Sequence, residues 1–282
     1  MEIYISLTTV PVRMEEWESS KQNLMSLLTQ NTNKDYKVIL NVPYNYKNND
    51  NENYVISENL LKLAEENNKL IINRVTNDYG PVVKITGVLP VSKNDDDILI
   101  ICDDDHVYHE DMLEYHLKKQ EQYTNSAIAF RGDVPIEKRE WEEDGIKKYV
   151  LRTTHFYFPV KHDLRLLIPG HWHSVSYRRK FFKEDFLDEE FLSLSNNDDI
   201  LVGYYFKKNR IPIICATWDK ETDYRPVNDY GRGSWSFPIK FPLPFPSSGF
   251  DEFRKKSGSG YGKTNIDVEK FMGNHDIIYI EN

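Results

Sequence analysis

The feature that most constrains the fold is the alternation of short β-rich runs with helical runs over the first 130 residues. The β-rich runs cover 3–9, 36–42, 69–75, 98–102 and 127–130. Segments with apolar residues at helical spacing lie between them, over 15–30, 57–67, 81–89 and 109–123. Strands separated by helices form a mostly parallel sheet with helices on both faces. The pattern therefore predicts an α/β fold of Rossmann type.

The pattern changes after Gly132. Short aromatic runs among charged residues predict hairpins over 133–165, and 171–182 reads as a strand that enters a turn. A helix is expected over 198–208 and a strand over 211–217, whereas the Asn-rich residues 44–54 suggest a loop. Residues 218–282 are rich in Pro, Gly and aromatic side chains and predict an irregular extension. We expect one compact domain with parts at 1–132, 133–217 and 218–282.

Composition limits the partners and the compartment. Hydrophobic residues make up 39% of the 282 residues, which is enough for a core, and the net charge of −9 argues against nucleic acid or an anionic membrane as the main partner. No run approaches the ~18 apolar residues of a membrane span, and the first residues lack the features of a signal peptide. Cys102 and Cys215 lie in apolar runs and are expected to be buried thiols. We expect a cytoplasmic protein.

Three consecutive carboxylates, Asp103–Asp105, follow the most apolar run of the chain. Ligands of open parallel sheets bind beyond the carboxyl ends of the strands. Carboxylates at positions i and i+2 there can share Mg²⁺ or Mn²⁺ with phosphate oxygens. The alternative is a solvated strand end. That is how we interpret a second triplet, Asp95–Asp97, which precedes the same strand at a distance of about 20 Å.

The triplet, within IICDDDHVY, resembles the Asp-x-Asp motif of GT-A glycosyltransferases. ISLTTVPVRM resembles the first strand and loop of that family, NDYGPVVKITGVL the segment that closes on the nucleotide, and NNDDILVGYYFKKNRI the acidic helix start. These four segments cover residues 1–217 in order. The likeness is to small family-2-like enzymes of bacteria and large viruses. It implies a GT-A fold in which 1–132 binds the nucleotide-sugar donor and 133–217 forms the acceptor side.

The resemblance implies a divalent metal, Mn²⁺ or Mg²⁺. Asp105 would bind the ion directly, and Asp103 would contact the ribose, or the ion through water. Asp104 is the third member of the donor site. His275, in MGNHDII, is a candidate third metal ligand, since many GT-A enzymes use a late histidine.

The resemblance also implies a nucleotide site. Thr8, Thr9 and Arg13 would border the base and ribose, although Arg13 reads equally well as a surface residue. Asp78 would hydrogen-bond the base or ribose. Lys84 would meet the phosphates as a point charge, although a lone lysine on a short helix usually faces solvent.

Asp198 and Asp199 begin the helical run in NNDDILVGYY. One aspartate serves as an ordinary N-cap, and the second is left over. An inverting transfer needs a carboxylate to take the proton of the acceptor hydroxyl. The match implies that Asp198 or Asp199 does so, with Asp199 preferred. The expected reaction is transfer from a nucleoside-diphosphate sugar, with UDP as the expected nucleotide, to a carbohydrate or other hydroxyl acceptor. A retaining mechanism stays open.

Several alternatives stay open. A nucleotidyltransferase would use a similar sheet, but TTVPVRMEEW lacks the usual glycines. A metal-dependent hydrolase could use His171 and His173, which would face the same way on a strand, although no further zinc ligand follows at the usual spacing. Trp172 or His173 could instead line an acceptor pocket or pack in the core. A non-catalytic carbohydrate-binding protein is the third alternative. SGSGYGKT, at 257–264, lacks the first glycine of a Walker loop.

Overall fold

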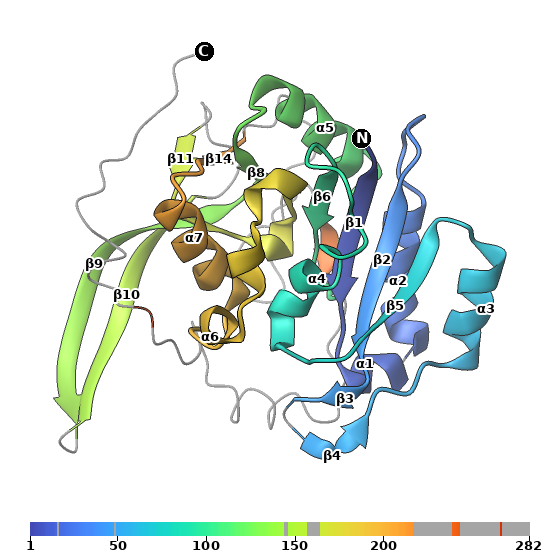
Figure 1. Ribbon diagram of the computed structural model, residues 1–282, viewed down its shortest axis with the longest axis horizontal. Helices are drawn as coiled ribbons and strands as arrows, with labels where there is room; N and C mark the ends of the chain where they lie inside the picture. Colours follow the sequence, from blue (N-terminus) through green and yellow to red (C-terminus); the bar gives the residue numbers. More distant parts are fainter. Residues whose placement is uncertain are drawn as a thin grey trace.

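A central sheet of eight strands organises the chain (Figure 1). The computed structural model describes residues 1–15, 17–47, 49–143, 146–156, 164–216, 239–242 and 266. The strand order is β11-β14-β8-β13-β6-β1-β2-β5. In that order the strands span Leu164–Leu166, Ile213–Cys215, Ala127–Ala129, Val175–Arg178, Ile98–Ile101, Ile3–Thr8, Lys37–Pro43 and Leu70–Val75.

Most of the sheet is parallel, as the alternating pattern predicts. β1 pairs in parallel with β2 and β6, β2 with β5, and β14 with β8. β13 pairs antiparallel with both β6 and β8, and β11 pairs antiparallel with β14. Six strands therefore run in one direction and two in the other. The predicted α/β class is confirmed.

Helices cover both faces of this sheet. On one face lie α1 (Pro11–Glu15), α2 (Trp17–Leu28), α3 (Glu58–Glu66) and α5 (Met112–Gln122). On the other lie α4 (Val83–Thr86), α6 (Glu189–Leu192) and α7 (Asp198–Lys208). Ser57 caps α3 as expected, because its side chain accepts a hydrogen bond from Leu60 N at 3.3 Å.

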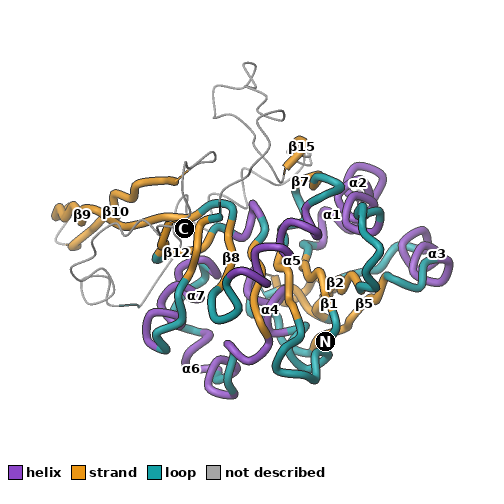
Figure 2. The backbone as a smooth tube through the Cα atoms, turned by 90° about the horizontal axis from the view of Figure 1, so that it is seen from above, coloured by secondary structure: helices purple, strands orange, loops and turns teal. Residues whose placement is uncertain are grey.

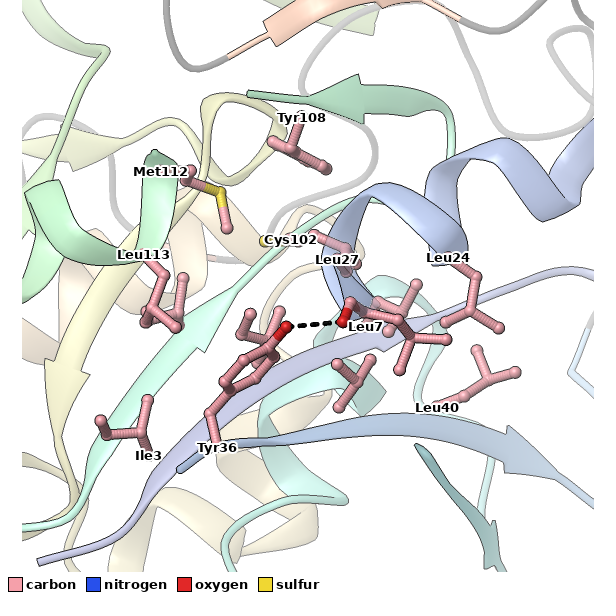
Figure 3. Close-up of a cluster of buried hydrophobic side chains, with 14 of the residues drawn as sticks. Ile3, Leu7, Leu24, Leu27, Tyr36, Leu40, Cys102, Tyr108, Met112 and Leu113 are labelled. Atoms are coloured by element: carbon pink, nitrogen blue, oxygen red, sulfur yellow. Dashed lines mark hydrogen bonds between the residues drawn. The ribbon is translucent and has the colours of Figure 1, made fainter. Parts of the chain in front are cut away.

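Alternate side chains of the strands supply two hydrophobic layers. Ile3, Ile5 and Leu7 of β1 belong to one layer, and Tyr4 between them belongs to the other. Figure 3 shows Ile3 and Leu7 in the first layer with Leu27 of α2 and Leu113 of α5. Burial of both faces explains why these strands read as continuous apolar runs. Cys102 and Cys215 are buried free thiols, as expected.

Smaller strands lie around the sheet. β9 (Gly132–Glu143) and β10 (Ile146–Phe156) form one long antiparallel hairpin that projects from the body (Figure 2), and β12 (Ile168–Pro169) pairs with β9. β15 (Ile239–Pro242) pairs with β7 (His106–Tyr108). β3 (Asn45–Tyr46) and β4 (Asn49–Asn53) form a short hairpin. The hairpin of β9 and β10 confirms the prediction over its first part, residues 157–163 lie outside the described residues, and the predicted loop over 44–54 is wrong.

The triplet Asp95–Asp97 is only partly solvated. Asp95 and Asp96 are exposed, but Asp97 is fully buried. Its carboxylate accepts hydrogen bonds from Glu2 N at 2.7 Å, Ser92 Oγ at 2.9 Å and Asn94 N at 3.1 Å. Our expectation was therefore wrong for Asp97, because the backbone N–H groups of Glu2, just before β1, and of Asn94 need an acceptor. Within the described part of the chain, no helix has the length and apolar character that crossing a bilayer requires.

Candidate functional site

The sheet changes its winding direction between β1 and β6. The chain builds β2 and then β5 on one side of β1, and it returns to place β6 on the other side. Open α/β sheets bind ligands at such a switch point, beyond the carboxyl ends of the strands. Thr9 follows β1 and Asp103–Asp105 follow β6, so topology alone brings these two segments together.

The backbone of the triplet is held from two sides. The buried Asn23 of α2 donates from Nδ2 to Asp103 O at 2.9 Å and to His106 O at 2.7 Å. The Tyr108 hydroxyl accepts from Asp103 N at 3.0 Å and donates to Trp172 O at 3.2 Å. The acidic loop therefore has a fixed shape, and this shape decides where its carboxylates can point.

The β1 loop is joined to the triplet through Asp104. Thr9 Oγ1 donates to Asp104 Oδ2 at 2.6 Å, and Arg13 Nε lies 3.6 Å from the same oxygen. Arg13 NH2 also lies 3.8 Å from Asp105 Oδ2, and Arg13 is only 7% exposed. Burial raises the pKa of the Asp104 carboxyl more than Arg13 lowers it. Arg13 is thus part of this cluster and not an exposed surface residue.

Lys84 links the triplet to the start of α7. Its ammonium makes a short contact with Asp103 Oδ1 and lies 2.8 Å from Asp198 Oδ2. The lysine is 3% exposed, so it does not face solvent as lone lysines on short helices usually do. Burial lowers its pKa, but Asp103 and Asp198 outweigh burial, so the pKa lies well above its ordinary value. Ser6 Oγ, which donates to Lys84 O at 2.5 Å, fixes α4 against β1.

His171 joins both aspartates of α7. Its Nδ1 lies 2.6 Å from Asp198 Oδ2 and 2.6 Å from Asp199 Oδ1, and its Nε2 lies 2.7 Å from the Tyr177 hydroxyl. The histidine is 1% exposed. Burial lowers the pKa of the imidazole, but Asp198 and Asp199 outweigh burial and raise it to about 9. At neutral pH the ring is therefore an imidazolium between two carboxylates.

Asp198 and Asp199 have different surroundings, although both begin α7. Asn197 is the N-cap, since its side chain accepts from Ile200 N at 2.9 Å. Asp198 lies against Lys84 and His171, and its pKa is well below the ordinary range because these two cations outweigh burial. The Asp199 side chain is 24% exposed, and burial together with Asp198 raises its pKa. Neither aspartate is the N-cap, so both are available for other roles.

Three predicted site residues remain, Thr8, Asp78 and His275. Thr8 Oγ1 donates to Asn41 O at 2.9 Å. Asp78 lies in the loop after β5, where it accepts from Lys47 N at 2.9 Å and Gly80 N at 2.8 Å. No bond among the described residues ties Thr8 or Asp78 to the triplet. His275 lies outside the described residues.

Two sets of side chains could hold a cation. In the triplet, Asp103 Oδ2 has no protein partner among the described residues, and Asp105 Oδ2 has only the 3.8 Å contact with Arg13. Burial raises the pKa of Asp105, but His106 and Arg13 lower it to about 2, so the group is ionised. Partly exposed carboxylates at positions i and i+2 fit Mg²⁺ or Mn²⁺. In the second set, His171, Asp198 and Asp199 offer ligand atoms within 4.8 Å of one another.

The two histidines of HWH do not act together. His171–His173 form a 3-10 turn and not a strand, so their rings point in different directions. His173 is buried near Arg131 and His106, and Arg131 lies 3.8 Å above the ring of Trp172. The expectation that both histidines face the same way was wrong, and the two-histidine zinc site loses its basis. The Trp172 carbonyl oxygen accepts from the Tyr108 hydroxyl, which in turn accepts from Asp103 N.

Sequence reasoning missed three residues of this site. Asn23 and Tyr108 gave no local signal, because each acts on backbone atoms brought close only by folding. His171 was noted only as part of a zinc or acceptor motif. A buried histidine beside two helix-start aspartates cannot be identified from spacing, since Asp198 lies 27 positions after His171 in the sequence.

Comparison with known proteins gives distant structural matches only. No family model and no curated protein matches this sequence. Among solved structures, S. aureus TarS matches at 15% identity and a TM-score of 0.47, over 78% of this chain and 36% of TarS. Francisella tularensis 2-C-methyl-D-erythritol 4-phosphate cytidylyltransferase (IspD) matches at 10% identity and a TM-score of 0.37, over 75% of this chain and 88% of IspD. The chain thus spans little more than a third of the length of TarS.

Proposed function

We propose that this chain is a metal-dependent glycosyltransferase of the GT-A type. It would transfer a sugar from a nucleoside-diphosphate sugar, UDP-sugar being the expected donor, to a carbohydrate or other hydroxyl acceptor, with inversion. The observation that carries the proposal is the contact of Lys84 with both Asp103 and Asp198. Three of the four segments that resemble the family meet at this one buried ammonium.

The fourth segment supports the same proposal. Thr9 and Arg13, from the loop after β1, contact Asp104 and Asp105 at the β1/β6 switch point. A nucleotide bound at this edge would lie against the β1 loop, with its diphosphate beside the triplet. Asp103 and Asp105 would hold Mn²⁺ or Mg²⁺, which would supply positive charge to the departing diphosphate. Arg13 and Lys84 place two further cations at the same edge.

Asp199 is the better candidate for general base. In an inverting transfer the acceptor oxygen forms a bond to the anomeric carbon, the bond from that carbon to the phosphate oxygen breaks, and the hydroxyl proton passes to a carboxylate. Asp198 is held by two cations and has a lowered pKa, so it is a poor proton acceptor. Asp199 is more exposed and has a raised pKa, which suits a base.

Calorimetric titration of UDP, with and without Mn²⁺, tests the donor site. Wild type should bind UDP with Mn²⁺, and Asp105→Ala should bind it at least tenfold more weakly, or about 1.4 kcal/mol. The exposed Asp95→Ala is the matched control and should bind as wild type does. UDP affinity that changes neither with Mn²⁺ nor with Asp105→Ala would refute the proposal. A parallel incubation with nucleoside triphosphate and sugar phosphate tests for a nucleotidyltransferase, and pyrophosphate release there would favour that alternative.

A further inference from the structure

We propose that His171 positions the general base, binding one oxygen of Asp199 from two sides so that the other oxygen stays available to the acceptor. This inference rests on the proposed function, because it requires Asp199 to take the acceptor's proton. His171 does not touch the reacting atoms in this role. It is a positioning residue that acts through Asp199.

Two nitrogens of His171, the backbone N–H and the ring Nδ1, converge on a single carboxylate oxygen. Its backbone N–H donates to Asp199 Oδ1 at 3.1 Å, and its ring Nδ1 lies 2.6 Å from the same atom. Among the described residues, none donates to Asp199 Oδ2. A carboxylate held at one oxygen by a backbone N–H and by a close ion-pair contact cannot rotate freely about its last bond. The direction of Oδ2 is therefore set by His171.

The ring of His171 is itself fixed from behind. Its Nε2 lies 2.7 Å from the hydroxyl of Tyr177, which is fully buried on β13. The Tyr177 ring packs edge-on against Phe182 and Phe206, at centroid distances of 5.2 Å for both. The 3-10 turn that carries His171 is held next to the end of β8, because Gly170 N donates to Arg131 O at 2.9 Å. The ring therefore has little freedom to follow a moving carboxylate.

The polar and charged groups around His171 leave one oxygen of Asp199 unoccupied. Asp198 and Asp199 face its Nδ1, and Tyr177 faces its Nε2. Lys84 reaches the same Asp198 oxygen at 2.8 Å, so Asp198 is shared between Lys84 and His171. Asp198 thus holds the two cations in place, and Asp199 is left with one oxygen bound. A metal-ligand role for His171 would instead need a bare Nδ1 lone pair directed at an ion.

Two substitutions separate these roles. The side-chain amide nitrogen of asparagine lies as many bonds from the backbone as Nδ1 of histidine, and that of glutamine as many as Nε2. His171→Asn therefore keeps a donor towards Asp199, whereas His171→Gln keeps only the partner of Tyr177. Both remove the imidazole, so loss of packing is similar in the two variants.

The assay is the release of UDP from UDP-glucose and UDP-N-acetylglucosamine, with water as acceptor and saturating Mn²⁺. His171→Gln should lower kcat by up to about 100-fold, as expected for a misplaced catalytic group, and leave the donor KM within about twofold. His171→Asn should stay within about fivefold of wild type. His116→Gln is the matched control, because His116 is equally buried and its Nε2 binds Ser174 Oγ at 2.8 Å beside the same turn. Its kcat should not change by more than about twofold.

Equal losses in His171→Asn and His171→Gln, or no loss in His171→Gln, would overturn the inference. Loss of Mn²⁺ binding in His171→Gln, measured without nucleotide by electron paramagnetic resonance, would also overturn it, because His171 would then be a metal ligand. Failure of the proposed function looks different. In that case wild type would neither bind nor cleave the UDP-sugars, or Asp199→Ala would cleave them at the wild-type rate.

Discussion

Replacement of Lys84 by methionine tests the contact on which the proposed site depends. Methionine has nearly the length of lysine and fills irregular space, so the change mainly removes a charge. The Lys84 ammonium lies 2.8 Å from Asp198 Oδ2 and also contacts Asp103. At an effective dielectric constant of about 20, one such contact corresponds to roughly 6 kcal/mol of Coulomb energy.

The net loss is smaller than the Coulomb energy, because burial of the charges opposes it. Removal of one partner from a buried ion pair costs about 3–5 kcal/mol, since it leaves a buried charge uncompensated. That is a large share of a total stability of about 5–15 kcal/mol. We expect Lys84→Met to lower the free energy of unfolding by about 3–5 kcal/mol at pH 7. Lys62→Met, which breaks only the exposed Lys62–Glu66 pair, should change it by less than about 1 kcal/mol.

The pH dependence has a definite sign. In the wild type the pKa of Asp198 is depressed in the folded state, because Lys84 and His171 outweigh burial. Its contribution to stability is present above the unfolded pKa of about 3.9 and is lost as the pH falls further. Lys84→Met loses most of that contribution at every pH. The difference in unfolding free energy between the two proteins should therefore narrow as the pH falls below about 4.

Equilibrium urea denaturation of both proteins at several pH values measures this difference. The double variant Lys84→Met with Asp198→Asn should be less destabilised than Lys84→Met alone, since it no longer buries an uncompensated carboxylate. A loss below about 1 kcal/mol at pH 7 would refute the reasoning. So would a double variant that is as unstable as the sum of its single changes.

Two other predictions concern the same face of the sheet. The pKa of His171 is raised from 6.5 to about 9, so protonated His171 stabilises the fold fully below about pH 6.5, and this stabilisation is lost as the pH rises through about 9. The shift corresponds to about 3 kcal/mol. In urea denaturation at pH 6 and pH 10, the free energy of unfolding should therefore fall more for wild type than for His171→Asn. Gly87→Ala should lower the free energy of unfolding by about 1–3 kcal/mol, because the added Cβ would lie 2.2 Å from Oδ1 of the buried Asn41. A melting temperature, measured by calorimetry, that equals that of wild type would contradict this prediction.

Much of the fold could be predicted from periodicity, because periodicity reports which faces are buried. The strands of the first half and α7 lie where the pattern placed them. The hairpin of β3 and β4 was missed, since Asn-rich strands lack the alternation of apolar residues that marks a buried face. The 3-10 turn at His171 was missed for a related reason. Three residues are too few to show any period.

Apart from Thr9, Arg13 and Lys84, which the family resemblance implied, the candidate site could be predicted only where a residue is marked by its place in a strand or helix. Asp103–Asp105 follow a buried strand, and Asp198 and Asp199 begin a helix, so position alone drew attention to them. The side chains that contact these carboxylates and shift their pKa values occupy no such recognisable position in the sequence. Lys84 and His171 come from different elements, and only the packed sheet brings them to the carboxylates, as it brings Asn23 to the backbone carbonyl of Asp103.

The charge of the assembled cluster explains why a cation belongs in the proposed reaction. Five carboxyl groups, Asp103, Asp104, Asp105, Asp198 and Asp199, meet the cations Arg13, Lys84 and His171 among the described residues, and the His106 ring, counted here as neutral, lies 2.5 Å from Asp105. With all of them ionised the excess is two negative charges, which one divalent ion would balance. A diphosphate would be repelled by the bare cluster and attracted once that ion is held. The proposed dependence of UDP binding on Mn²⁺ therefore agrees with the protein's own charges, and that dependence should weaken when Asp105 is replaced.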